Sequence, residues 1–130
     1  MSTKKVLPTE KELEILKIIW AEGPCTVRFV NDQLNREKKV GYTTTLKLMQ
    51  IMVDKNILKR DEEQRSHVYK ALHKEKETIG RMMNRFLEKV FSGSTPSFVM
   101  QALGSRKTTK KEIDEIKAFL DKLEREGRVE

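Results

Sequence analysis

Cysteine, histidine and aromatic residues are scarce in this sequence of 130 residues. The single cysteine, Cys25, cannot form an intramolecular disulfide. Next to Pro24 in a tight turn, it is expected to be a small buried or half-buried residue, with a redox-sensing thiol as the alternative. With only His67 and His73 beside it, no spacing of cysteine and histidine matches a metal site, and none is expected. Aromatic residues make up 6% of the chain and fall mostly on apolar faces, which argues against binding of single-stranded RNA by base stacking.

Long apolar runs and catalytic motifs are also missing. No apolar stretch approaches the length that spans a membrane, and the N-terminal residues lack the apolar core of a signal peptide. We therefore expect a cytoplasmic protein without membrane contact. There is no glycine-rich phosphate loop and no nucleophile with a neighbouring base motif, so neither enzyme activity nor a cofactor is expected.

Positive charge is in excess: charged residues make up 36% of the chain, and the formal net charge is +7. The excess is spread over both halves of the chain, so there is no isolated basic tail. Such a balance favours a polyanion as partner but does not identify a fold. The length suits one ordinary domain or two small ones.

Capping patterns predict two helices in the first part of the chain. Thr9 and Glu12 form a capping box, in which the hydroxyl and the carboxylate each accept a backbone N–H. The helix that follows should end at Gly23-Pro24, and Thr26 is expected to cap a second helix. The inward faces of the two helices are predicted to hold Leu13, Leu16, Ile19 and Trp20, with Ile15 at the flank, and then Val27, Val30 and Leu34.

A third helix is predicted from about Thr43 to Lys55, with Asn56 as its C-cap. Two short strands, 57–60 and 66–72, should follow it around a charged turn. The apolar face of the third helix is expected to hold Leu48, Ile51 and Met52, and its opposite face Thr43, Thr44, Thr45, Lys47 and Gln50. Three helices followed by a hairpin is the order of a winged helix-turn-helix, whose third helix enters the DNA major groove.

The start of the third helix is the sharpest candidate site. Thr43 and Thr44 can donate to phosphate oxygens or touch base edges, and their methyl groups can pack on thymine methyl groups. Lys47 can reach a guanine edge or a phosphate, and Gln50 lies further along. The alternative is that the threonines only cap and start a helix.

Basic residues around this helix are weaker candidates for DNA contacts. Arg65 lies in the turn of the hairpin, where it can contact the DNA backbone or the neighbouring minor groove. Lys38 and Lys39 lie in the loop before the third helix and can sit over phosphates. For these basic residues, a merely solvated loop is the competing interpretation.

The second half of the chain predicts a separate helical domain. Residues 73–78 are polar and mark a boundary, so we expect a winged-helix domain at 1–72 and a helical dimerisation domain at 73–130. Thr95, followed by Pro96, is expected to cap the second helix of this half, and Thr109 with Glu112 forms a capping box for the third. Three helices in so few residues cannot bury their apolar faces alone, so a homodimer is predicted. The alternative is that these helices fold back on the N-terminal domain. The expected dimer interface comprises Met82, Met83, Phe86, Leu87, Val90, Phe98, Ile116, Phe119, Leu120 and Leu123.

Several segments together resemble the penicillinase-repressor family (the BlaI/MecI/CopY type) of winged-helix transcriptional regulators. They are Leu7-Pro8-Thr9 to Trp20, Tyr42-Thr-Thr-Thr with Leu46 and Leu48, Asp54-Lys-Asn-Ile-Leu58, and Arg65 with Tyr69. The resemblance covers about residues 7–125. It implies a homodimeric repressor that binds a two-fold symmetric operator and controls antibiotic-resistance or stress genes.

The resemblance also implies a sensor protease as a partner in one branch of the family. The bond cleaved in that branch aligns with Gln101-Ala102, whose residue types differ from the family's Asn-Phe. Ile51 stands where the family usually has arginine, and Gln64 where it usually has glycine. The C-terminal cysteine pairs of the copper-sensing branch are absent.

The sequence thus predicts a mainly α fold with a small β-hairpin, built from an N-terminal winged helix and a C-terminal helical dimerisation domain. The expected function is that of a homodimeric, DNA-binding transcriptional repressor. The main alternative is a winged helix used as a protein-interaction module without specific DNA binding.

Overall fold

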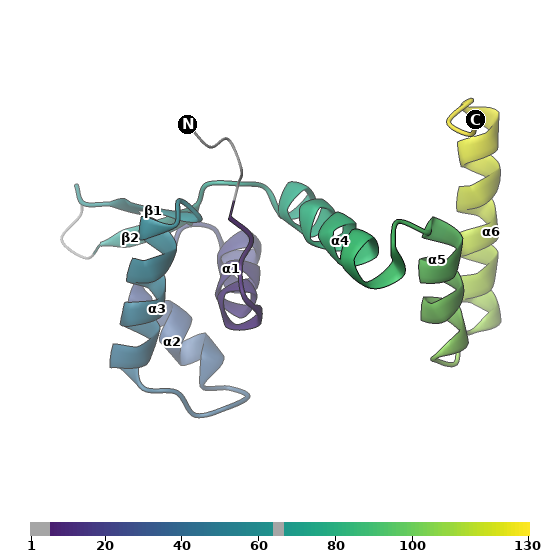
Figure 1. Ribbon diagram of the computed structural model, residues 1–130. Coiled ribbons are helices and arrows are strands. Elements are labelled where there is room, and N and C mark those ends of the chain that lie inside the picture. The colour runs from purple at the N-terminus through teal and green to yellow at the C-terminus, as the bar shows by residue number, and fades with distance from the viewer. Residues whose placement is uncertain (1–5, 64–66) are drawn as a thin grey trace. The chain divides into compact units, whose positions relative to one another are not determined.

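The computed structural model describes residues 6–63 and 67–130, and these residues form six helices and one antiparallel hairpin (Figure 1). The chain divides into two compact units, Met1–Asn84 and Arg85–Glu130. The predicted fold class is confirmed. In chain order the elements are α1 (Glu10–Glu22), α2 (Val27–Leu34), α3 (Tyr42–Asp54), β1 (Leu58–Asp61), β2 (Val68–Ala71), α4 (Glu75–Phe91), α5 (Thr95–Gly104) and α6 (Lys110–Arg125).

The predicted caps of the first two helices are confirmed. The Thr9 hydroxyl accepts the backbone N–H of Glu12 at 3.2 Å, and the Glu12 carboxylate accepts that of Thr9 at 2.9 Å. Helix α1 ends at Gly23, whose φ of 87° suits glycine, and Thr26 caps α2. Asn56 follows α3 with a φ of 60°, the left-handed conformation that asparagine tolerates.

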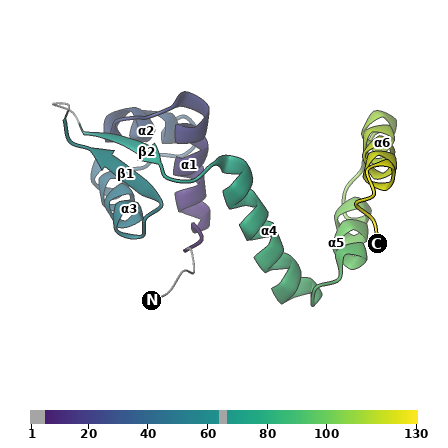
Figure 2. The same ribbon diagram turned by 90° about the horizontal axis from the view of Figure 1, so that it is seen from above.

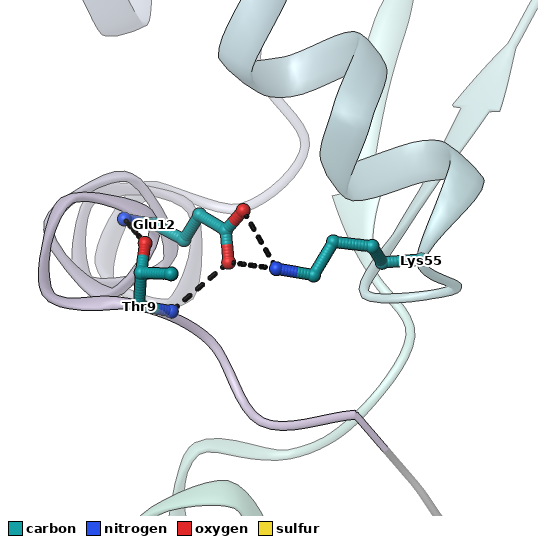
Figure 3. Close-up of polar contacts among 3 residues, drawn as sticks. All are labelled: Thr9, Glu12 and Lys55. Atoms are coloured by element: carbon teal, nitrogen blue, oxygen red, sulfur yellow. Dashed lines mark hydrogen bonds and ion pairs between the residues drawn. The ribbon is translucent and has the colours of Figure 1, made fainter.

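Glu12 also fixes helix α1 to the far end of α3. Its carboxylate, which is buried, accepts two hydrogen bonds from Lys55 Nζ at 2.7 and 3.0 Å (Figure 3). Lys55 is the C-cap of α3, where a positive charge is favoured by the helix dipole. A single carboxylate therefore caps one helix and holds the end of another.

The core of the N-terminal unit lies between its three helices and the hairpin. Helix α1 packs against α2, α3 and β2, and α3 packs against α2 and β1 (Figure 2). Ile15, which the sequence places at the flank of α1, is fully buried, whereas Leu13 and Trp20 are half-buried. The buried apolar residues are Ile15, Leu16, Ile19, Cys25, Val27, Val30, Met49, Met52, Ile57, Leu58 and Tyr69.

The hairpin is joined to the segment between α1 and α2. Strands β1 and β2 pair with Leu58 opposite Ala71 and Arg60 opposite Tyr69. The backbones of Tyr69 and Cys25 exchange two hydrogen bonds of 2.8 and 3.0 Å. Tyr69 is thereby held in the core.

Cys25 is buried, as expected for a structural thiol, and its Sγ lies 2.9 Å from the carbonyl oxygen of Gly23. Burial and the nearby Glu22 carboxylate raise the pKa of this thiol above 9.0. The neutral form is therefore favoured in the folded state, and its contribution to stability is lost as the pH rises through that pKa.

We expect Cys25 to react with a disulfide reagent such as Ellman's reagent about tenfold or more slowly in the native protein than in the unfolded chain, because the thiolate is the reactive form. Absorbance at neutral pH with and without denaturant measures the two rates. Equal rates would show that the thiol is accessible in the folded protein, and would return redox sensing to consideration.

Two helix starts differ from the sequence prediction. Helix α4 begins at Glu75, so most of the polar segment 73–78 is its first turn rather than a linker. Lys17 Nζ bonds the Glu75 carboxylate at 2.8 Å, and Trp20 Nε1 donates to the carbonyl oxygen of His73 at 2.9 Å. These contacts with α1 hold the segment 73–78, whose polar composition had suggested a domain boundary. The N-cap of α5 is Ser94 and not Thr95, with Pro96 in the first turn.

The C-terminal unit has no interior of its own. No residue from Arg85 to Glu130, all of which the structure describes, is buried. Phe86, Phe91 and Phe98 form a cluster with ring centroids 5.3–6.1 Å apart, yet Phe86 remains 51% exposed. The Thr109–Glu112 capping box that starts α6 is present, and hydrogen bonds with Thr109 hold the pKa of Glu112 below its usual value.

Among the helices of the described chain, none is both long and apolar enough to cross a membrane.

Candidate nucleic-acid interface

Helix α3 presents one face to the core and the other to solvent. Its buried residues are Thr45, Met49 and Met52, with Leu48 half-buried. The sequence placed Thr45 on the exposed face and Ile51 on the apolar face, and both placements are wrong. Thr45 is fully buried, whereas 39% of the Ile51 side chain is exposed.

Thr45 is buried because a polar partner meets it inside the protein. Asn31, on α2, donates through Nδ2 to Thr45 Oγ1 at 2.8 Å and to the carbonyl oxygen of Val40 at 3.1 Å. Asn35 donates to the Val40 carbonyl at 2.9 Å and accepts the Val40 N–H at 3.1 Å. These bonds fix the loop before α3 and the first turn of α3 on α2, so the exposed face has a defined orientation.

The exposed face of α3 is a polar stripe. Thr43, Lys47, Gln50 and Asp54 follow one another at intervals of four, three and four residues and therefore lie along one line of the helix. Thr44 and Ile51 are exposed beside this line. The stripe offers hydroxyl, ammonium and amide groups to a partner, with the Asp54 carboxylate at its far end.

The N-terminal end of α3 is open. Gly41 is the N-cap, and no side chain among the described residues bonds the free backbone N–H groups of the first turn. The interpretation of the threonines as helix caps is therefore wrong, because neither Thr43 nor Thr44 caps this helix. Both hydroxyls are exposed, and the positive end of the helix dipole lies beside them.

Arg28 and Tyr42 also belong to the candidate site, although no pattern in the sequence predicts their contact. The Arg28 guanidinium carbon lies 4.6 Å from the centroid of the Tyr42 ring, a cation–π contact between α2 and the first residue of α3. Both side chains are exposed. Their fourteen-residue separation in sequence hides the pairing, which places a held guanidinium next to the open helix end.

Lys38 and Lys39 are exposed in the loop between α2 and α3, as the sequence predicts. Arg65 lies outside the described residues, as does Gln64.

In the hairpin, Arg60 is paired with Glu62, and hydrogen bonds with Tyr69 and then Glu62 raise its pKa. Lys59 and Lys70 are the exposed cations that stand opposite each other on β1 and β2.

The residues of the predicted dimer interface lie on α4, α5 and α6. Phe86, Val90, Phe119 and Leu120 are each more than half exposed, and Met83 is 48% exposed. Met82, Leu87, Phe98, Ile116 and Leu123 are half-buried. Gln101 and Ala102 are exposed within α5.

Comparison with known proteins places the sequence in one family. The sequence model of the family described as penicillinase repressor matches residues 8–122. The penicillinase repressor of Staphylococcus aureus is 24% identical over 121 residues, which cover 93% of this chain and 96% of that protein. The penicillinase repressor of Bacillus licheniformis is 24% identical over 87% of this chain and 88% of that protein.

Two further similarities involve proteins with other names. The methicillin resistance regulatory protein MecI of Staphylococcus aureus strain N315 is 21% identical over 94% of this chain and 99% of that protein. A solved structure of a mutant of Lactococcus lactis ZitR aligns with 95% of this chain and 80% of that chain, at 18% identity and a TM-score of 0.40. The family assignment rests on the sequence comparisons and not on this structural alignment.

Proposed function

The chain belongs to the penicillinase repressor family, and from this membership we propose that it is a homodimeric repressor of transcription that binds a two-fold symmetric DNA operator. The family is one of transcription regulators, so the chain is not an enzyme. The observation that carries the proposal is the polar stripe of α3, exposed on a helix whose other face is fixed in the core.

In this proposal α3 lies in the major groove of one half-site. Thr43 and Thr44 contact phosphates or base edges at the open helix end, Lys47 contacts a guanine edge or a phosphate, and Gln50 a base edge further along. The basic residues that hold the DNA backbone are Lys38, Lys39 and Arg65, which the sequence predicted, together with Arg28.

The dimer is proposed because the C-terminal unit leaves its apolar side chains uncovered. A soluble protein rarely exposes so many large apolar side chains without a partner surface. A second copy of the same unit can cover all three helices at once through a two-fold axis. Two copies of α3 then meet two half-sites, which should be spaced by one or two DNA turns, roughly 10 to 21 base pairs.

The names of the relatives support resistance genes as the regulated targets. The sensor protease implied by the resemblance stays a proposal as well. The bond between Gln101 and Ala102 lies inside α5, so its cleavage would require the last turns of that helix to unwind.

The competing function is a winged helix that binds another protein and no specific DNA. Footprinting of the purified protein on DNA upstream of its own gene, at two salt concentrations, separates the two. A protected two-fold symmetric site whose affinity falls steeply with salt supports the repressor. Uniform weak protection at both salt concentrations would refute it.

Lys47→Ala is expected to weaken binding to the protected site by about 1–3 kcal/mol and binding to random DNA by less, because a base contact discriminates between sequences. Titration of both DNAs in the same buffer measures the difference. Lys117→Ala, at an exposed position of α6, removes the same charge outside the proposed interface and serves as control. An equal loss on both DNAs would make Lys47 a phosphate contact only.

A further inference from the structure

Ile51 is an apolar side chain on the exposed side of α3. Met49 and Met52 fill the core side of α3, while Ile51 points away from it with 39% of its surface exposed. It lies one turn beyond Lys47 and two turns beyond Thr44, next to the polar stripe. The position therefore contributes little to the core, and it faces whatever the stripe binds.

We propose that Ile51 recognises the methyl group of a thymine in the operator, and so is a specificity-determining residue of this repressor. The inference rests on the proposed function and adds the identity of one base pair. Ile51 has no hydrogen-bonding group, so it cannot bind a phosphate or read the donors and acceptors of a base edge. The thymine C5-methyl is the apolar group that the major groove presents.

Position and chemistry agree in this assignment. A helix in the major groove touches base edges with its N-terminal residues, and Ile51 extends that contact face, because it lies in the third turn of α3 on the same side as Thr44 and Lys47. Because Ile51 is exposed to water in the free protein, its contact with a methyl group removes apolar surface of both partners from water. Loss of one buried methyl group should weaken binding about fourfold.

The probe is a duplex selected from a random-sequence library by the full-length protein. Each thymine of the selected site is replaced in turn by uracil, which lacks only the methyl group. We expect one position in each half-site at which uracil weakens binding by about fourfold, while most other thymines tolerate the change.

Two variants identify the side chain that reads this methyl group. Ile51→Ala should bind the thymine duplex about tenfold less tightly than the wild type and should no longer distinguish thymine from uracil at that position. Val129→Ala is the matched control, because it removes exposed methyl groups at a residue outside the proposed DNA interface. The control should keep the fourfold preference.

Three results would overturn the assignment. The first is a selected site at which uracil is tolerated at every position. The second is an Ile51→Ala variant, folded by circular dichroism, that still prefers thymine. The third is a Val129→Ala variant that loses the preference. All three leave a specific DNA-binding protein, whereas selection that enriches no site would refute the proposed function together with the role of Ile51.

Discussion

Replacing Phe86 and Leu120 together by aspartate is expected to convert the proposed dimer into monomers and to weaken operator binding by about a hundredfold or more. Both side chains are slightly more than half exposed in a single chain and lie on the apolar faces of α4 and α6. In a dimer each aspartate would bury a charge without a partner, which is strongly unfavourable. Sedimentation velocity and titration of the footprinted duplex measure the two effects.

A matched control is available on the same helices. Asn84→Asp with Ala118→Asp adds the same negative charge two residues away, on the exposed sides of α4 and α6. This variant should remain dimeric and keep operator affinity to within a few-fold. A dimeric Phe86→Asp, Leu120→Asp variant would mean that the two copies meet elsewhere, and a monomeric wild type would favour helices that fold back on the N-terminal unit.

Glu12→Ala is expected to lower the free energy of unfolding by about 3 kcal/mol, because it removes a cap of α1 and leaves Lys55 without its carboxylate. The loss lies at the low end for a buried ion pair, since 27% of the Lys55 side chain is exposed and can be rehydrated. Urea denaturation followed by circular dichroism measures it. A loss below about 1 kcal/mol would show that the pair contributes little beyond an exposed one.

Three further variants separate the cap from the ion pair. Glu12→Gln keeps an acceptor for the backbone N–H of Thr9 but no charge for Lys55, so its loss should be intermediate. Lys55→Met, made in the wild type and in the Glu12→Ala variant, gives the coupling free energy between the Glu12 and Lys55 side chains. Glu112→Ala removes the equivalent residue of the exposed capping box of α6 and should be the mildest of the set.

Local chemistry explains why so much of the fold could be predicted from the sequence. Helix caps act within a few residues of their own positions, so neighbouring residues alone indicate them. This holds for the two capping boxes and for the helix ends at Gly23 and Asn56. One residue of error at the start of α5 arose because Ser94 and Thr95 are equivalent capping residues.

The exposed face of α3 was harder to predict, because contacts with residues distant in sequence determine which side of the helix is buried. Thr45 resembles its neighbours Thr43 and Thr44, but its hydroxyl has partners inside the protein, since it accepts from Asn31 Nδ2 and donates to the carbonyl oxygen of Gly41. Because Thr45 faces the core, α3 is rotated about its axis relative to the sequence prediction, and Ile51 is therefore exposed. The contact of Arg28 with Tyr42 likewise joins two helices and leaves no periodic signal.

If the proposed dimer forms, the uncovered side chains of the C-terminal unit make the order of that unit depend on the concentration of the protein in the cell. With no residue buried between Arg85 and Glu130 in one chain, ordering of this unit would draw on association and follow mass action. In the dilute regime a twofold fall in total protein would lower the dimer about fourfold. The operator would then be released by a modest drop in synthesis or a modest rise in degradation, without any ligand bound to the repressor.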